Sequence, residues 1–380
     1  MPHLSFASNY LWVLVIGLLG PSVPAILEDL SIGYAQAGLF FTLLALGSLF
    51  GTFLGGVASD ALNRRALFAG IALALAVGLI GAALAPSYGL ILLAVFLFSL
   101  FGSPAGTVGQ SVMLDLFPQR RERLLALMSL FGAVGSFTAP LMVSVNYAAG
   151  LSWRWPFAEA AVMSLALFVA ILRVPLPRSR GRLQSWGELG RVLGHPRVLA
   201  SAVLIFFSVA PDLGFSFWLA EHFRTELHVD LRLASAVVSV YLIGVMAGRL
   251  SASSLLRRFT APRLVQAGLL LSLASLFAFL SVRWIPAKVL AIAAYGLGVA
   301  PVFPMLMAAG TSVFPDRPGA VSGALFASVS LGGMVFPFML GAAAAAIGIR
   351  RSYLLVALIL AGLLAAVHAG RRRLFTPGGV

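Results

Sequence analysis

The stretch LWVLVIGLLGPSVPAI runs from Leu11 to Ile26 without a charged residue. Its length approaches the roughly 20 apolar residues that a helix needs to cross a lipid bilayer. A secretory signal peptide would show a positively charged segment before such a run and a small-residue cleavage site after it, and neither is present. We therefore expect this stretch to form a retained membrane-spanning helix.

Comparable apolar runs follow along the whole chain, bounded by charges and by Pro and Gly. Of the 380 residues, 60% are hydrophobic and 10% are charged, whereas a soluble domain has about a quarter of its residues charged. We expect an all-α membrane protein of twelve transmembrane helices in two pseudo-symmetric six-helix bundles. The expected spans are 8–28, 34–59, 66–86, 89–116, 124–149, 155–172, 198–222, 233–256, 263–282, 287–313, 319–347 and 351–369.

Basic residues are unevenly distributed among the connections. Most of the 26 Lys and Arg residues lie at the termini and in the connections that follow even-numbered spans, for example Arg64-Arg65, Arg257-Arg258 and Arg371 to Arg373. Because Lys and Arg accumulate on the cytoplasmic side, we expect a multi-pass protein of the bacterial inner membrane with both termini in the cytoplasm. The net charge of +14 then reflects topology and attraction to anionic headgroups, and we expect no nucleic-acid partner.

The two halves of the chain repeat each other. A shift of 197 residues takes Gly47 to Gly244, and it superposes further Gly and Pro residues in the same way. These pairs are Gly51 with Gly248, Pro104 with Pro301, Gly135 with Gly332 and Pro140 with Pro337. We expect bundles at 1–172 and 198–380, joined by a cytoplasmic linker at 173–197 in which Leu183, Trp186, Leu189 and Leu193 follow an amphipathic helical spacing. Duplicated halves of this kind place a substrate site near the middle of the membrane.

Several chemistries are not indicated by the sequence. The chain has no cysteine, and its five histidines are scattered, so no metal-ligand spacing is present. No phosphate-binding Gly-Lys loop is found. We expect neither an enzyme nor a cofactor-binding protein, but a monomer whose partners are a small-molecule substrate, membrane lipids and, as an open alternative, protons.

The connection between the second and third spans carries a recognisable motif. It consists of Gly56, Asp60 four residues on, and Arg64-Arg65. It resembles the signature loop of the major facilitator superfamily, although Ala61 and Asn63 stand where that family usually has a basic residue and a glycine. The resemblance implies a cytoplasmic latch formed by Gly56, Asp60, Arg64, Arg65 and Asp115, in which Asp60 can cap a helix N-terminus.

Three further stretches resemble the fucose and glucose permease-like sugar porters of that superfamily. They are Gly20-Pro21-Ser-Val-Pro24, expected to end the first helix, the pair Asp212 and Trp218 followed by Glu221-His222-Phe223, and Gly298-Val-Ala-Pro301-Val-Phe-Pro304. The resemblance implies a sugar-like substrate. The coupling acids of those porters in their first and fourth helices are missing here, so coupling by that route is not implied.

Ionisable groups within a membrane are costly and mark functional sites by default. Asp212, directly after Pro211, is the candidate for binding substrate or carrying a proton, and an acid at the mouth of a water-filled vestibule is the alternative. Glu159 is the second proton-coupling candidate, with a pair to Arg154 as the alternative. Glu221 and His222 are expected to be solvated, and Arg249 is expected to reach the cytoplasmic surface or to hold an anionic substrate.

The remaining candidates are neutral polar, aromatic and proline residues. The expected substrate-binding residues are Gln36, Gln110, Asn146, Asp212, Trp218, Tyr241 and Tyr295, and the expected gating residues are Pro211, Pro301 and Pro304. Phe206, Phe207, Phe215 and Phe217 are expected to pack or to face lipid. Because each unpaired buried polar group costs roughly 1–3 kcal/mol, this polar set is small for a hexose.

The function that we expect is secondary active transport by alternating access. The leading hypothesis is a small, sugar-like solute, with proton coupling through Asp212 left open. The alternative is efflux of amphipathic compounds or lipids, which need fewer polar partners.

Overall fold

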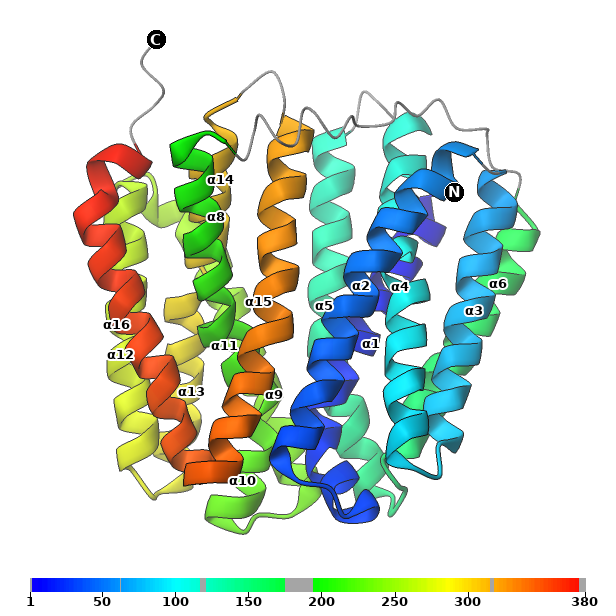
Figure 1. The fold of residues 1–380 in the computed structure, drawn as a ribbon, viewed down its shortest axis with the longest axis horizontal. Helices are drawn as coiled ribbons and strands as arrows, with labels where there is room; N and C mark the ends of the chain where they lie inside the picture. Colours follow the sequence, from blue (N-terminus) through cyan, green and yellow to red (C-terminus); the bar gives the residue numbers. More distant parts are fainter. Residues whose placement is uncertain (1, 62, 117–120, 175–193, 315–317, 376–380) are drawn as a thin grey trace. The chain divides into compact units, whose positions relative to one another are not determined.

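The computed structural model describes residues 2–61, 63–116, 121–174, 194–314 and 318–375. In these residues the regular structure is helical, and twelve helices are long and apolar enough to cross a membrane. Figure 1 shows these helices running alongside one another within each half of the chain. The expected twelve-helix, all-α membrane fold is therefore confirmed.

The chain divides into two compact units. The first takes residues 1–183 and 229–236, and the second takes residues 184–228 and 237–380. The helices from the first half are α1 (Pro2–Leu30), α2 (Tyr34–Ala61), α3 (Arg64–Leu84), α4 (Tyr88–Leu116), α5 (Arg121–Ala148) and α6 (Arg154–Leu172). Those from the second half are α8 (Pro196–Val209), η2 (Ala210–Gly214), α9 (Phe215–Phe217), α10 (Leu219–Leu227), α11 (Leu231–Leu255), α12 (Ala261–Ser281), α13 (Ile285–Val299), α14 (Val302–Thr311), α15 (Pro318–Ile347) and α16 (Ile349–Leu374).

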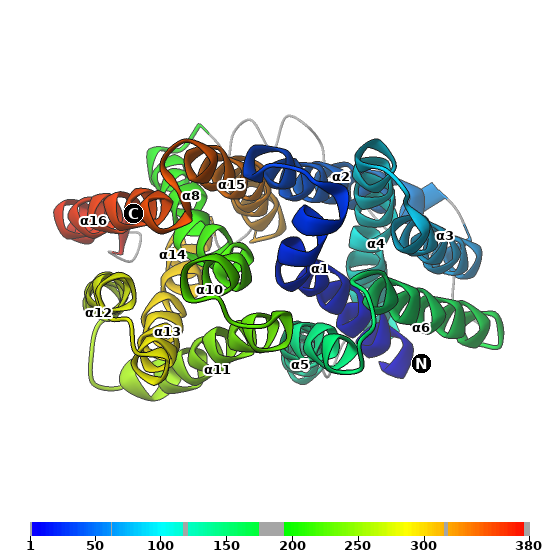
Figure 2. The same cartoon turned by 90° about the horizontal axis from the view of Figure 1, so that it is seen from below.

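Helix α1 is the central helix of the first unit, where it contacts α4, α5 and α6 (Figure 2). It begins at Pro2, earlier than the expected residue 8, because Phe6 in its first turns packs against Met113 of α4 and Met128 of α5. The Ser8 hydroxyl donates to the Ala105 carbonyl oxygen (3.2 Å), and the Asn9 amide donates to that of Met128 (2.8 Å).

The end of α1 lies within two residues of the expected residue 28. The helix continues through Pro21 and Pro24 to Leu30. Helix-breaking residues are tolerated in spanning helices where neighbouring helices and hydroxyl side chains satisfy the freed backbone groups. Within this stretch the Ser22 hydroxyl donates to the Leu18 carbonyl oxygen (2.8 Å).

The repeated glycines mark the closest helix contacts in each unit. A Cβ atom at Gly51 on α2 would collide with the Leu100 carbonyl oxygen on α4, and one at Gly248 on α11 would collide with that of Leu297 on α13. Each carbonyl follows its glycine by the same number of residues. The repeat seen in the sequence is thus a repeat of helix contacts, because only glycine allows two backbones to approach so closely.

Two spans of the second unit are interrupted. The first is built from α8, the π-helical turn η2 and α9, and it breaks again at Trp218 before α10. The second breaks between α13 and α14 at Pro301, while Pro304 lies in the first turn of α14. The linker region 175–193, with its expected amphipathic helix, lies outside the described residues.

Candidate functional site

Asp212 lies on the π-helical turn that interrupts the α8–α9 span. Proline at 211 has no backbone N–H to continue the α-helical pattern, and the Phe215 N–H bonds back to the Ala210 carbonyl oxygen, five residues earlier. Such π-bulges are frequent at functional sites. The Tyr241 hydroxyl donates to Oδ1 of Asp212 (2.5 Å). Among the described residues Oδ2 makes no hydrogen bond, so this oxygen is available to a donor from outside the chain.

The aromatic candidates surround this turn. The Tyr295 hydroxyl donates to the Pro211 carbonyl oxygen (2.7 Å), and the Phe215 ring stacks on Tyr295 with centroids 4.0 Å apart. The fully buried Trp218 donates its indole N–H to the Pro337 carbonyl oxygen (2.9 Å). The structure thus brings Asp212, Tyr241 and Tyr295 together. The polar side-chain atoms of Tyr241, Tyr295 and Trp218 form hydrogen bonds within the second unit.

Gln36 and Gln110, two neutral amides of the first unit, lie far apart. The Gln36 side chain accepts from the Gly33 N–H at the start of α2 (2.9 Å), and its backbone oxygen accepts from the Tyr88 hydroxyl (3.0 Å). Gln110 is exposed on α4, 22 residues beyond Tyr88, which corresponds to roughly 33 Å along the helix. These two amides therefore lie near opposite ends of the unit and cannot contact one small solute together.

Asn146 and Glu159 form a pair between α5 and α6. The Asn146 amide donates to Oε2 of Glu159 (3.1 Å) and to the Met142 carbonyl oxygen (3.0 Å). The buried Oδ1 of Asn146 has no partner among the described residues. The alternative in which Glu159 pairs with Arg154 is therefore wrong.

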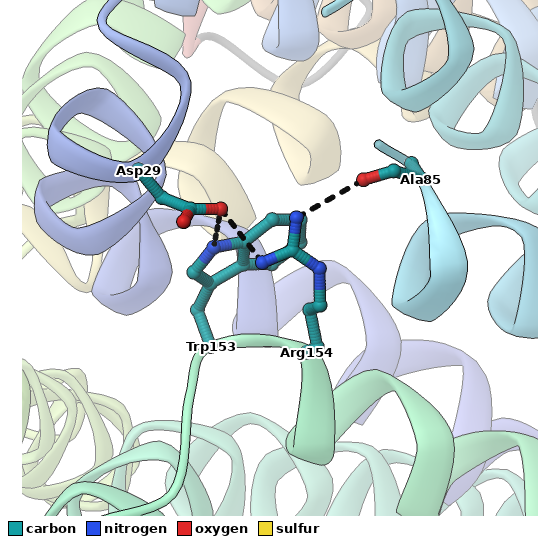
Figure 3. Close-up of polar contacts among 4 residues, drawn as sticks. All are labelled: Asp29, Ala85, Trp153 and Arg154. Atoms are coloured by element: carbon teal, nitrogen blue, oxygen red, sulfur yellow. Dashed lines mark hydrogen bonds and ion pairs between the residues drawn. The ribbon is translucent and has the colours of Figure 1, made fainter. Parts of the chain in front are cut away.

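Arg154 instead bonds to Asp29, a residue that the sequence did not single out (Figure 3). The Arg154 guanidinium donates to Oδ2 of Asp29 (2.6 Å) and to the Ala85 carbonyl oxygen (3.1 Å), and it lies over the Trp153 ring at 4.4 Å. The Trp153 indole N–H donates to the same Asp29 oxygen (3.1 Å). This network, here called the Asp29 clamp, ties the ends of α1 and α3 to the start of α6.

Glu221 and His222 are not solvated as expected. Glu221 is 5% exposed and bonds to the Thr225 hydroxyl (2.6 Å). His222 is fully buried beside Phe279 and Tyr353, and neither ring nitrogen has a hydrogen-bond partner among the described residues. Burial, followed by the positive charges of Lys288 and Arg350, lowers the pKa of His222 to about 3. The imidazole is therefore neutral at physiological pH.

Lys288 is a buried cation that the sequence analysis missed. Its ammonium group donates to the Phe279 carbonyl oxygen (2.6 Å) and lies 4.5 Å from the centre of the Phe279 ring. The 197-residue shift relates Lys288 to Ile91 and His222 to Ala25, which are both buried and apolar. A comparison of the two halves could have revealed Lys288 and His222, because the equivalent positions in the first half hold apolar residues.

The latch residues are described only in part. Arg65 is exposed, while the surroundings of Gly56 and the side chains of Asp60, Arg64 and Asp115 lie outside what the structure describes. The Asn63 side chain caps α3 by accepting from the Arg65 and Ala66 N–H groups (2.9 and 3.4 Å). Asn63 therefore caps α3, while the expected capping role of Asp60 falls on a side chain outside the described residues. Arg249, on α11, is exposed.

The described residues contain no group of three or more His, Asp or Glu side chains that could hold a metal ion. Fold and site together describe a multi-pass helical membrane protein with an acid on an interrupted span. The model of the Major Facilitator Superfamily matches residues 6–337 and 213–376. The chain belongs to this superfamily, and as such it is a transporter of small solutes.

Among curated relatives, the uncharacterised transporter YfkL of Bacillus subtilis is 28% identical, over 83% of this chain and 82% of its own. A TsgA homologue of Erwinia tasmaniensis is 26% identical, over 73% and 70%. Two solved structures share the fold at low identity. A bacterial homologue of the human lysosomal transporter Spinster has a TM-score of 0.79 at 15% identity, over 99% and 98% of the two chains. The nucleoside transporter NupG has 0.74 at 18%, over 97% of each.

Proposed function

We propose that this chain is a secondary active transporter of a small, hydroxyl-bearing solute of the sugar or nucleoside class, working by alternating access. The observation that supports this proposal is the Asp212 carboxylate, which has one oxygen held by Tyr241 and the other free of described partners. A carboxylate oxygen accepts hydrogen bonds from hydroxyl groups strongly, because the acceptor is charged. A nucleoside is included because NupG, a nucleoside transporter, shares the fold.

Proton coupling through Asp212 is part of the proposal. Acids within a spanning segment mark proton relays as well as substrate sites. Asp212 sits on an irregular turn, and irregular backbone at membrane depth is tolerated where it is buried in protein or lines a cavity. Pro211, Pro301 and Pro304 would then act as gating positions in the two interrupted spans. We further propose that the chain resides in a bacterial inner membrane with both termini in the cytoplasm, as the distribution of arginines favours.

A second candidate function is efflux of amphipathic compounds. The observation that favours it concerns three aromatic residues. The polar side-chain atoms of Tyr241, Tyr295 and Trp218 already form hydrogen bonds within the second unit. A cavity lined by such residues offers few polar partners, which suits a largely apolar solute.

A ligand screen followed by transport assays separates these functions. Sugars, nucleosides, organic anions and amphipathic cations are tested for thermal stabilisation of the purified chain, and uptake of each positive compound is measured in proteoliposomes. A sugar or nucleoside should raise the thermal midpoint and be accumulated when a proton gradient is imposed. Stabilisation by amphipathic cations alone would contradict the leading proposal and support efflux.

Asp212→Asn tests the role of the acid. If Asp212 carries the proton, the variant should lose gradient-driven accumulation by about tenfold or more while retaining exchange of solute across the membrane. If Asp212 binds the solute, exchange should fall as well. Tyr241→Phe should weaken uptake because it removes the hydrogen bond to Oδ1 of Asp212. Tyr88→Phe, the same change at the first residue of α4, should have little effect. Normal accumulation by Asp212→Asn would refute the proposed role.

A further inference from the structure

An apolar groove of about 580 Å³ runs between α2 and α3 in the first unit, with α4 as its floor. Its walls carry small residues, among them Gly55 and Ala58 on α2 and Ala66, Gly70 and Ala74 on α3. Helix α4 packs against both α2 and α3, whereas these two helices touch each other only sparsely. The groove therefore opens outward between them.

Gly70 is the residue that keeps the groove open. A Cβ atom added there would meet no atom within 4 Å. This sets Gly70 apart from Gly51 and Gly55, where an added Cβ atom would collide with α4. A glycine inside a helix is less favourable than alanine, and here no helix contact requires it. Its effect on the structure is to leave space at the centre of the groove.

The length of the groove matches one leaflet of a bilayer. A second hollow shares Gly70, Ala74 and Phe101 with the first and continues along α3 to Gly78. From Asn63 to Gly78 the hollow surface spans 15 residues of α3, or about 22 Å. The hydrocarbon part of one leaflet is about 15 Å thick, and one leaflet with its polar region is about 20–22 Å thick. An extended acyl chain together with the glycerol region would fill this length.

One end of the groove is polar and lies beside an exposed cation. Asn63 is the only polar residue among the described residues of the lining, and it stands at the end where α3 begins. Arg65 is exposed. An arginine at the headgroup level attracts anionic lipids. An apolar groove with the exposed Arg65 near its polar end therefore complements a molecule with an acyl chain and an anionic head.

We propose that the groove between α2 and α3 binds an anionic phospholipid from the leaflet on the side of the α2–α3 connection. One acyl chain lies over Gly70 and Ala74, and the phosphate lies beside Asn63 and Arg65. The groove and Asp212 belong to different units, and lipid retention is measured without a transport assay.

Native mass spectrometry of the purified full-length chain tests this site, with dioleoyl phosphatidylglycerol and dioleoyl phosphatidylcholine supplied in equal amounts. Wild-type protein should retain the anionic lipid about fivefold over the zwitterionic one. Gly70→Leu fills the groove and should lower the retained anionic lipid about fivefold. Gly362→Leu is the matched control, because a Cβ atom at this lipid-exposed glycine of α16 also meets no atom. An equal loss in both variants, or no loss in Gly70→Leu, would overturn the proposal.

The charge at the mouth is tested by Arg64→Gln with Arg65→Gln. These changes should bring retention of the two lipids to about the same level without abolishing it, since the acyl groove is intact. Unchanged preference for phosphatidylglycerol would count against the assigned headgroup position.

A measurement on the unaltered chain guards against variants that fail to fold. Phosphatidylglycerol with a photoactivatable diazirine in one acyl chain is incorporated into proteoliposomes and cross-linked, and the labelled peptides are mapped. Labels should be enriched in 63–78 relative to 349–371, the span that carries Gly362. Equal labelling of the two segments would show bulk lipid contact only and would refute the site.

Discussion

Arg154 lies five residues before Glu159, yet its guanidinium bonds to Asp29, which is 125 residues away in the chain. Residues three or four apart share a face of a helix, whereas residues five apart do not. The sequence therefore suggested the wrong partner, since nothing local points to Asp29. Asp212 was easier to recognise, because an acid beside a proline within an apolar run is unusual in itself.

The Asp29 clamp should contribute to the stability of the first unit. Arg154→Ala removes the bonds to Asp29 and Ala85 and the contact with the Trp153 ring, and we expect a loss of about 1–2 kcal/mol. Differential scanning fluorimetry in detergent should show a thermal midpoint lower by a few degrees. Arg351→Ala, an exposed arginine on α16, is the control. Equal midpoints for wild type and Arg154→Ala would mean that the clamp does not hold the helix ends.

His222 should make stability depend on pH. Its pKa is about 3 in the folded protein, against about 6.5 in an unfolded chain. The unfolded state therefore binds the proton first, so the stabilisation is complete above about pH 6.5 and is lost as the pH falls toward 3. The thermal midpoint should decrease between pH 7.5 and 5. His222→Gln should reduce the change of the thermal midpoint with pH. His228→Gln, at an exposed histidine, should leave that change as it is in the wild type. A pH dependence that persists in His222→Gln and is lost in His228→Gln would show that His222 does not cause it.

At the scale of elements, the repeat predicted the helix contacts well and predicted the helix ends poorly. The glycines occur at equivalent positions in both halves because a larger side chain would force two helix backbones apart. Aligning the two halves of the sequence therefore identifies them. The start of α1 could not be predicted this way, since Phe6 stands among polar residues and its packing partners lie on α4 and α5. The π-helical turn was also not predicted, because a proline indicates that a helix is interrupted but not which geometry the interruption takes.

The glycine contacts should be intolerant of larger side chains. Gly51→Leu forces α2 away from α4, and overpacking of this kind costs typically 1–3 kcal/mol or more. We expect lower yield of folded protein in fluorescence-detected size-exclusion chromatography and a lower thermal midpoint. Gly248→Leu should behave alike in the second unit, because its Cβ atom would meet the Leu297 carbonyl oxygen. Gly362→Leu should be nearly neutral; a similar loss there would mean that helix contact is not the cause.

For the molecule as a whole, the sidedness of the connections is a prediction from charge alone. The absence of cysteine makes it testable without background labelling. Ser152→Cys, between α5 and α6, should react with a membrane-impermeant maleimide in intact cells. Thr260→Cys, between α11 and α12, should react only after the cells are lysed. The reverse pattern would invert the proposed topology.

The glycine contacts have a consequence for how the chain can change in length. Phe96 follows Gly47 by 49 residues and Leu100 follows Gly51 by 49, and the same spacing joins Gly244 to Ala293 and Gly248 to Leu297. The segment in between contains α3 or α12, which are both 21 residues long. An inserted residue there would have to be absorbed between two fixed anchor points. Epitope tags and insertions should therefore be better tolerated in the connection at 173–197, which is outside these closed intervals.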